Sequence, residues 1–458
     1  MKNVYTLILT IFLTGCVLTR PTDPYIRDEA PISVPVKPPV QYDKALTLER
    51  AIEIALTNNP DILSRHWETE AALARYNQTF GEGLPRLSVA GSYTHYLDPQ
   101  RILPVGQPGD PAILSRDISS AELILTVPIF SGGRLIRQIK AADLLRQAAS
   151  HQLARSREEL IFNVTSLFYN IRSRYHVMES LTFSEKTLTE HLNRMQALIE
   201  SEKAANVDKM RMEVRLADVK QKQVQEKNLL SIQKRALANI LGLEDQVLEI
   251  HQEKVLLPPD KIVDTPDLDS ALTYALKERG DYLATRSSLE ARAGLVDAAR
   301  AASWPQISLR SSYGGRMATG PVSGTGDKQG DIGSVGLSLE IPLFQGWQIS
   351  AAVREQKAKL YAEQEQLRKL ELQIRLDVET AHSNIRSLAE RLEAIQTSIS
   401  QAKESHRIEQ EKYILGKGTI VDVLDAQTAL LETETTYYQL LAEYHTARAQ
   451  LKMAMGEE

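Results

Sequence analysis

Residues 412–427 read KYILGKGTIVDVLDAQ and separate two stretches with helical periodicity. In this segment, Gly416 and Gly418 can end one helix, and Thr419 or Asp422 can cap the next one. Upstream of it, apolar or small residues recur every three or four positions, which is the spacing of a coiled-coil seam. They are Leu367, Leu370, Ile374, Val378, Ala381, Ile385, Leu388, Leu392, Ile395, Ile399 and Ala402. The segment therefore predicts a tight turn between a helix of roughly 100 Å and a returning helix.

The same arrangement occurs twice in the chain. Residues 48–93 recur 220 positions later and residues 128–242 recur 214 positions later, as in the pairs Leu48/Leu268, Pro85/Pro305, Tyr93/Tyr313, Asp208/Asp422 and Gly242/Gly456. We therefore predict two structural repeats, 45–250 and 267–456, joined by a linker at 251–266. Each repeat is expected to contain a first helix (46–80 and 267–300), two strands, a very long helix and a returning helix.

The predicted strands, 86–97, 119–128, 305–315 and 333–342, alternate between apolar and polar residues. Their length of about 8 to 11 residues is that of a transmembrane β-strand. A soluble sheet with one solvated face has the same alternation, so the pattern leaves both kinds of sheet open. Four strands are too few for a membrane barrel, because the smallest barrels have about eight. If the strands span a membrane, several chains must share them, and three chains would supply twelve.

The first 16 residues, MKNVYTLILTIFLTGC, have the features of a bacterial export signal. Lys2 precedes a short apolar run, which ends at Cys16, the only cysteine in the chain. The LTGC run predicts a lipoprotein with a signal peptide at 1–15, a lipidated Cys16 and a Pro-rich tether at 16–44. The alternative is an ordinary secretory leader with an incidental cysteine. A single cysteine also excludes an intramolecular disulfide.

Composition and motifs argue against several classes of function. The net charge is −5 and there is no basic patch, so nucleic acid is not a predicted partner. The nine histidines are scattered, with no pair four residues apart, so no metal site is predicted. Neither a GxSxG nor an HExxH motif occurs. We therefore expect a protein that is not an enzyme and that uses no cofactor.

Several of these features together resemble the TolC family of bacterial outer-membrane efflux channels. They are the YxxGxxxxxDVLDAQ pattern at 413–427, the LTGC run, the duplication, and the order of strands and long helices. The resemblance implies a mainly α-helical homotrimer, with a twelve-stranded β-barrel in the outer membrane and a long α-helical barrel in the periplasm. Gly132, Gly133 and Gly346 stand where this family passes from barrel to helices. The implied partners are outer-membrane lipid, a periplasmic adaptor protein and an inner-membrane pump.

The resemblance also implies roles for residues near the helix breaks. Asp422 and Asp425 match aspartates that form an acidic ring in the tunnel, and Tyr413 and Asp208 match a pair that latches the closed gate. The residues alone favour a second interpretation, in which Asp422 caps a helix and Asp425 is a solvated carboxylate.

The turns at the helix tips would dock the adaptor in this family. Here they are Glu202, Lys203 and Ala204 in the first repeat, and Gly416, Lys417 and Gly418 in the second. Two positions depart from the family pattern. Gly418 replaces an arginine that completes the latch in some members, and Glu202 replaces the usual glycine.

We therefore expect the outer-membrane channel component of a tripartite export system, lipid-anchored and projecting into the periplasm, which passively conducts small toxic molecules or metal ions. A lipidated N-terminus is commoner in the drug and metal efflux channels of the family than in its protein exporters. Two alternatives are a type I protein-secretion channel and a lipid-anchored periplasmic coiled-coil adaptor. The duplicated hairpin and the four membrane-length strands argue against the adaptor.

Overall fold

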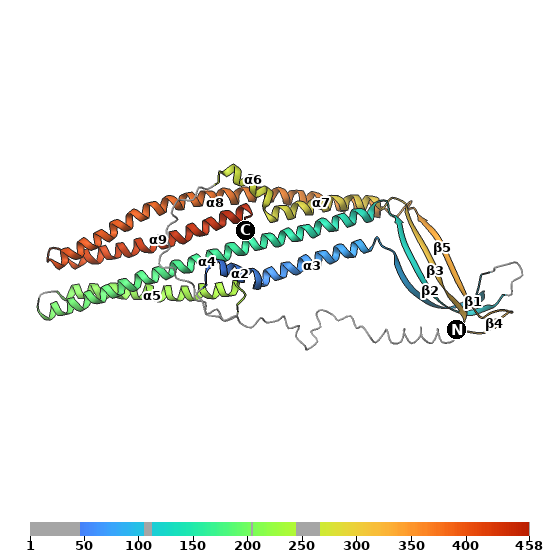
Figure 1. The fold of residues 1–458 in the computed structure, drawn as a ribbon, viewed down its shortest axis with the longest axis horizontal. Coiled ribbons are helices and arrows are strands. Elements are labelled where there is room, and N and C mark those ends of the chain that lie inside the picture. Colours follow the sequence, from blue (N-terminus) through green and yellow to red (C-terminus); the bar gives the residue numbers. More distant parts are fainter. Residues whose placement is uncertain (1–45, 105–111, 203–204, 244–265, 458) are drawn as a thin grey trace. The chain divides into compact units, whose positions relative to one another are not determined.

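The computed structural model describes residues 46–104, 112–202, 205–243 and 266–457 (Figure 1). The predicted signal peptide, Cys16, the tether, Lys203, Ala204 and nearly all of the linker lie outside the described residues. The described chain is mainly helical and contains one antiparallel sheet, which confirms the predicted fold class.

Both repeats contain the same helices and long strands in the same order. The first has α2 (Leu48–Asn58), α3 (Pro60–Gly81), β1 (Arg86–Arg101), β2 (Leu114–Phe130), α4 (Arg134–Glu200) and α5 (Asn206–Ile240). The second has α6 (Leu268–Glu278), α7 (Gly280–Ala301), β3 (Gln306–Ala318), the short β4 (Val322–Ser323), β5 (Gln329–Glu340), α8 (Gln348–Ile414) and α9 (Ile420–Met455). The long helices α4 and α8 each contain 67 residues.

The first helix of each repeat differs from the expectation of one continuous helix. Extended backbone at Asn59 separates α2 from α3, and extended backbone at Arg279 separates α6 from α7. In the first repeat the local sequence explains the break, because Pro60 disfavours a helical residue before it. In addition, the Asn59 side chain accepts hydrogen bonds from the N–H groups of Asp61 and Ile62, which caps α3.

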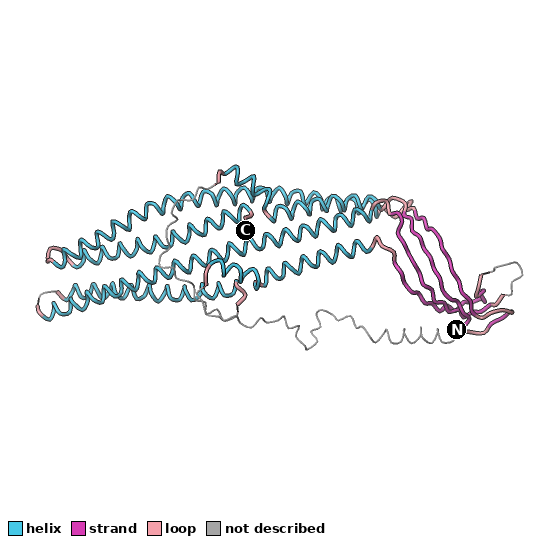
Figure 2. Tube along the Cα trace, viewed as in Figure 1, coloured by secondary structure: helices cyan, strands magenta, loops and turns pink. Residues whose placement is uncertain are grey.

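The four long strands form a sheet with the order β1-β2-β3-β5, in which all neighbours are antiparallel (Figure 2). They extend a few residues beyond most of the predicted ends. The register places apolar side chains on one face, called here the apolar face; they are Leu87, Val89, Tyr93, Leu123, Leu125, Leu309, Tyr313, Val335, Leu337 and Leu339. Serine, threonine, glycine and charged residues dominate the opposite face, called the polar face.

Left-handed backbone connects the strands to the long helices. Gly132 and Gly133 have φ values of 63° and 80° before α4, and Gly346 has 57° before α8. Trp347, which corresponds to Gly133 across the repeats, also has a positive φ of 65°. The two repeats therefore share a backbone conformation at this turn even where the residue differs.

Two apolar clusters within the described residues hold several of the helices together. One lies between α6, α8 and α9 and includes Val378, Ile385, Leu441 and Tyr444. The other joins α4, α5 and α9 near the helix tips and includes Leu188, Met195, Met212, Val423 and Leu424. In these packings α9 contacts both α8 and α4. No helix within the described ranges combines the length and the apolarity that crossing a membrane requires.

The breaks at Asn59 and Arg279 also hold the ends of the returning helices. Asn59 Nδ2 donates to the carbonyl oxygen of Ile240 (2.8 Å), and Arg279 Nη1 donates to that of Ala454 (3.3 Å). Ile240 and Ala454 are 214 positions apart, so the two contacts correspond in the duplication. Each satisfies a carbonyl group that a helix C-terminus leaves without a partner. We call these contacts the first and the second joint.

The second joint contains buried charge. The Arg279 side chain is only 2% exposed and contacts Asp281 of α7 (2.7 Å) and Asp377 of α8 (3.0 Å). Arg155 of α4 lies 3.8 Å from Asp281 and donates to the carbonyl of Met453. The joint therefore connects α4, α7, α8 and α9.

We predict that Arg279→Met destabilises the protein by about 1–3 kcal/mol, because it leaves two half-buried carboxylates without their cation and the Ala454 carbonyl without its donor. The midpoint of thermal unfolding, followed by circular dichroism in detergent, should fall clearly. Arg368→Met is the control, because Arg368 is exposed and its contact with Glu365 is a surface pair worth about 0–1 kcal/mol. Equal midpoints for the two variants would contradict the prediction.

The difference in stability between the wild type and Arg279→Met should depend on pH. Burial raises the pKa of Asp281, but the hydrogen bonds and charge of Arg279 outweigh it, so this pKa lies below its usual value of 3.8. A lowered carboxyl pKa contributes stability that is present above the unfolded value and is lost as the pH falls through the folded value. The difference between wild type and Arg279→Met should therefore shrink below about pH 3.8.

Candidate functional site at the helix tips

The turn between α8 and α9 is closed by backbone hydrogen bonds. Gly416 has a φ of 69°, its N–H donates to the carbonyl of Tyr413 (3.0 Å), and the Lys417 N–H donates to that of Lys412 (2.8 Å). This pair of bonds is the Schellman motif, which needs a left-handed residue and therefore favours glycine. A Cβ on Gly418 would lie 3.1 Å from Lys412 Cβ, so a larger residue would have to displace that side chain slightly.

After α4, the left-handed conformation of Gly416 recurs at a different residue. Glu202 corresponds to Gly416 in the duplication and has a φ of 62°. Its N–H donates to the carbonyl of Ile199 (2.9 Å). A non-glycine residue in this conformation carries about 1–2 kcal/mol of strain. The sequence difference at Glu202 is thus a difference in strain, and the left-handed conformation at this position is kept.

Asp422 takes part in a capping box at the start of α9. Its Oδ2 accepts hydrogen bonds from the Thr419 N–H (3.0 Å) and hydroxyl (2.6 Å), and the Asp422 N–H donates to Thr419 Oγ1 (3.3 Å). The hydrogen bond from the Thr419 hydroxyl lowers the pKa of Asp422, and the one from the Thr419 N–H adds to this effect. One carboxylate oxygen of Asp422 is therefore committed to its own helix.

Asp425 is less constrained. Its side chain is 67% exposed, and its nearest cationic group is Arg215 Nη2 of α5, at 3.5 Å. Asp208, on the first turn of α5, contacts Arg211 of the same helix at 3.4 Å. Sequence reasoning did not identify Arg215, because the pair forms only when α5 and α9 lie side by side.

Tyr413 lies close to Asp208. Tyr413 is half-buried against the apolar cluster at the tips. Burial raises its pKa, the negative charge of Asp208 raises it further, and Arg194 of α4 opposes this change. Within the described ranges, no hydrogen bond joins Tyr413 to Asp208. The two side chains therefore interact through charge, and Arg194 is a third member of the group that the sequence did not reveal.

Behind this group, Gln427 ties α9 to α4. Gln427 is buried, and its Nε2 donates to Ser184 Oγ (3.3 Å). Gln427 is the last residue of the DVLDAQ run, so part of that motif serves packing between helices. The start of α9 is thus held from both sides, by the Thr419 cap and by this contact.

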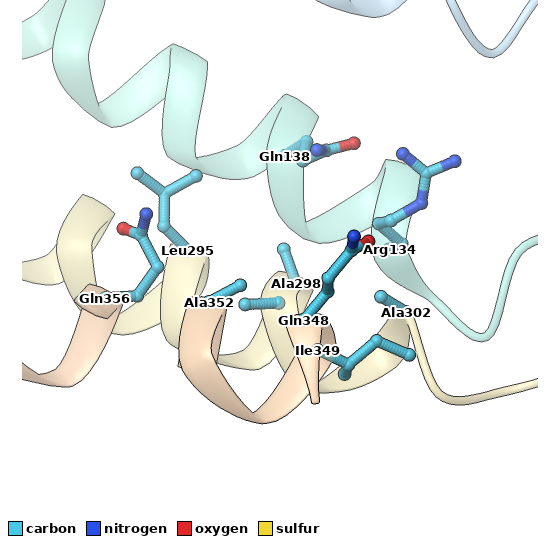
Figure 3. Close-up of a pocket in the computed structure, with 10 residues that line it drawn as sticks. Arg134, Gln138, Leu295, Ala298, Ala302, Gln348, Ile349, Ala352 and Gln356 are labelled. Carbon is cyan, nitrogen blue, oxygen red and sulfur yellow. The ribbon is translucent and has the colours of Figure 1, made fainter. Parts of the chain in front are cut away.

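A cavity of about 320 Å³ lies where the strands enter the helices (Figure 3). Arg134 and Gln138 of α4 and Gln356 of α8 contribute polar groups. Ala298 of α7 and Ala302, which directly follows α7, form part of the wall. Arg134 Nε, Gln138 Oε1 and Gln356 Oε1 have no protein hydrogen-bond partner within the described chain. The cavity has room for several water molecules, which can bind these atoms.

The described residues contain no group of three or more His, Cys, Asp or Glu side chains suited to a metal ion. The acidic side chains at the tips, Asp208, Asp422 and Asp425, are instead paired with arginines or used as a cap. These carboxylates can therefore influence charged solutes that come close to the tips. The Asp422 cap can also hold the turn before α9 in place.

Known proteins resemble this chain in sequence and in fold. The family described as outer membrane efflux protein matches residues 51–243 and 271–457, one stretch in each repeat. Outer membrane protein TolC of Escherichia coli K12 is 23% identical over 434 residues, which cover 90% of this chain and 83% of TolC. The cobalt-zinc-cadmium resistance protein CzcC of Cupriavidus metallidurans is 22% identical over 337 residues, covering 72% of this chain and 76% of CzcC.

Among solved structures, the CmeC outer membrane channel of Campylobacter jejuni has a TM-score of 0.76 at 19% identity, covering 89% of this chain and 85% of that one. This likeness shows a common fold. The resemblance to the TolC family is confirmed, and so is the expected location in the outer membrane. With both repeats matched, the chain belongs to the outer membrane efflux protein family.

Proposed function

We propose that this chain is the outer-membrane channel of a tripartite export system, in which three copies form one conduit that passively passes small toxic molecules or metal ions. An adaptor protein and an inner-membrane pump would supply the cargo and the energy. The name of the relative CzcC supports metal ions as one class of cargo.

The observation that carries the proposal is the pair of open sheet edges. Within the described residues, β1 and β5 each pair with a long strand on one side only. Leu87, Val335 and Leu337 of the apolar face are exposed in the single chain. In lipid, an apolar face is favourable but an unpaired edge is not. Three copies with four long strands each would close the sheet and leave no edge.

The duplication suggests how the helices of neighbouring copies meet. Inside one chain, α4 of the first repeat packs on α7 of the second. The corresponding pair is α8 of one copy with α3 of the next. Both faces carry exposed apolar side chains in the single chain, among them Trp67 of α3 (68% exposed) and Leu372 of α8 (64%). Leu372 corresponds to the buried Glu158 of α4, so burial at this position is expected in the assembly.

This correspondence predicts a contact between copies. Asp281 and Arg155, 3.8 Å apart within the chain, correspond to Asp61 and Lys369. We expect Asp61→Cys with Lys369→Cys, treated with a short bismaleimide, to give a three-chain species on a denaturing gel, and the cross-linked particle to conduct ions in planar bilayers.

The control pair is Asp61→Cys with Glu371→Cys, because Glu371 faces α7 of its own chain through Tyr282. Cross-linking of the control pair to the same extent would refute the arrangement. An inserted protein that does not conduct would refute the channel.

We also propose that Asp208, Tyr413, Asp422 and Asp425 lie at the periplasmic gate. The turns at Glu202–Ala204 and Gly416–Gly418 would dock the adaptor. Exposed apolar side chains beside these turns support docking; they are Val207, Met210, Ile414 and Leu415. The exposed carboxylate of Asp425 supports an acidic ring, since three-fold symmetry would bring its copies together.

We predict that Asp425→Ala lowers the preference for cations and weakens block by trivalent cations in planar bilayers, because it removes an exposed charge from the ring. Asp422→Ala should act differently, since its carboxylate is committed to Thr419. It should speed amide hydrogen exchange in the first turn of α9 and change selectivity less. Unchanged selectivity and block in Asp425→Ala would place the gate elsewhere.

Finally, we propose that Cys16 is the lipidated N-terminus of the mature protein, which the LTGC run supports. Mass spectrometry of the purified protein should find an acylated N-terminal Cys16 peptide. Because the barrel would anchor the protein independently, Cys16→Ala with a substitute leader should still reach the outer membrane. An unmodified N-terminus beyond Cys16, or a retained leader, would disprove lipidation.

A further inference from the structure

The polar face of the sheet carries charges whose positions the strand register defines. Arg86 of β1 is opposite Thr126 of β2, and Thr126 is opposite Arg310 of β3. The two arginines therefore lie on the same face and at the same position along the strands, with β2 between them. At about 4.8 Å per strand, their backbones are roughly 10 Å apart.

Neither arginine is balanced by a nearby acid. The polar-face carboxylates are Glu122 and Glu340. Glu122 is four residues from Thr126 along β2, and Glu340 is four residues from Gly336, the partner of Arg310 on β5. Each is roughly 13 Å along the strand from the level of the arginines. Both arginines are exposed, and neither has an ion pair or a side-chain hydrogen bond within the described chain.

Arg316, unlike these two arginines, has an acidic residue close to it on the polar face. It lies opposite Ser120, two residues along β2 from Glu122, so Arg316 and Glu122 are diagonal neighbours on the polar face. Diagonal neighbours are within reach of long side chains. Arg316 therefore has an acidic residue within reach on the same face, whereas Arg86 and Arg310 do not.

From this placement we infer that Arg86 and Arg310 form a basic belt in the lumen, which favours anionic solutes over metal cations. The inference rests on the proposed function, because the polar face becomes a lumen only when three copies close the barrel. Every second strand, β1 and β3 of each copy, then carries one of these arginines. Because the strands of a barrel tilt, the six guanidinium groups form two rings of three, offset by roughly 6 Å along the barrel axis. Arg86 is the first residue of β1 and lies just after α3, so the belt surrounds the helix end of the barrel.

The belt narrows the class of cargo. Guanidinium groups bind carboxylates and phosphates well, and they repel divalent cations. Ions in the lumen would pass close to the wall charges, which act over about 8 Å at physiological ionic strength. Of the two cargo classes in the proposed function, the belt therefore favours small molecules over metal ions, and among small molecules it favours organic anions or amphiphiles with an anionic group.

The test compares selectivity in planar bilayers across a KCl gradient. Arg86→Gln with Arg310→Gln should shift the permeability ratio toward cations by roughly two- to fivefold, because it removes six positive charges from the wall of the lumen. Citrate added on the barrel side should reduce the K⁺ current of the wild type and not that of the double variant. Zn²⁺ added on the same side should permeate better in the double variant.

Two further variants separate charge from folding. Arg86→Lys with Arg310→Lys keeps the charge and should behave like the wild type. Arg316→Gln removes an arginine that has Glu122 as a diagonal neighbour, and it should shift selectivity less than the double variant. A double Gln variant with wild-type selectivity and citrate response would overturn the belt, as would Lys variants that behave like the Gln variants. Wild-type protein that inserts without conducting would overturn the proposed function itself.

Discussion

Hydrogen bonds from Asn59 and Arg279 to the last carbonyl groups of α5 and α9 fix where the returning helices end. Glycines follow these carbonyls, and a Cβ on Gly242 would lie 2.5 Å from the carbonyl oxygen of Asn58. Each returning helix is held at this end by its joint and along its length by packing, α5 on α4 and α9 on both α8 and α4, so both constraints position the opposite end, at the tip. The joints thus help to set the position of the turns that carry the candidate gate.

Asp422 is compatible with both interpretations of its role, as a helix cap and as an exposed carboxylate at the tip. Asp422 caps α9 through Thr419, as the residues alone suggested, and it remains exposed at the same time. Asp425 makes no cap and keeps most of its surface, with Arg215 as its nearest cation. Of the two carboxylates, Asp425 is therefore the one whose oxygen atoms are not used to cap α9. Asp422 acts mainly by holding the turn from which α9 and Asp425 project.

Long-range periodicity made the fold largely predictable. The three- and four-residue spacing predicted α4 and α8, and alternation predicted the four long strands. The break at Asn59 has a local cause in Pro60, but the break at Arg279 depends on tertiary packing. There, a Cβ on Gly280 would lie 2.5 Å from the carbonyl of His151. The arginines near the tips, Arg194 and Arg215, were not predicted, since their partners are far away in sequence.

The duplication explains the two strained residues. Glu202 and Trp347 are the non-glycine residues with positive φ in the described chain, and each corresponds to a glycine in the other repeat, Gly416 and Gly133. A strained conformation persists when its surroundings over-determine it. At both positions the left-handed conformation is kept while the residue changes. Glu202 therefore places a carboxylate at the first tip where the second tip has a glycine.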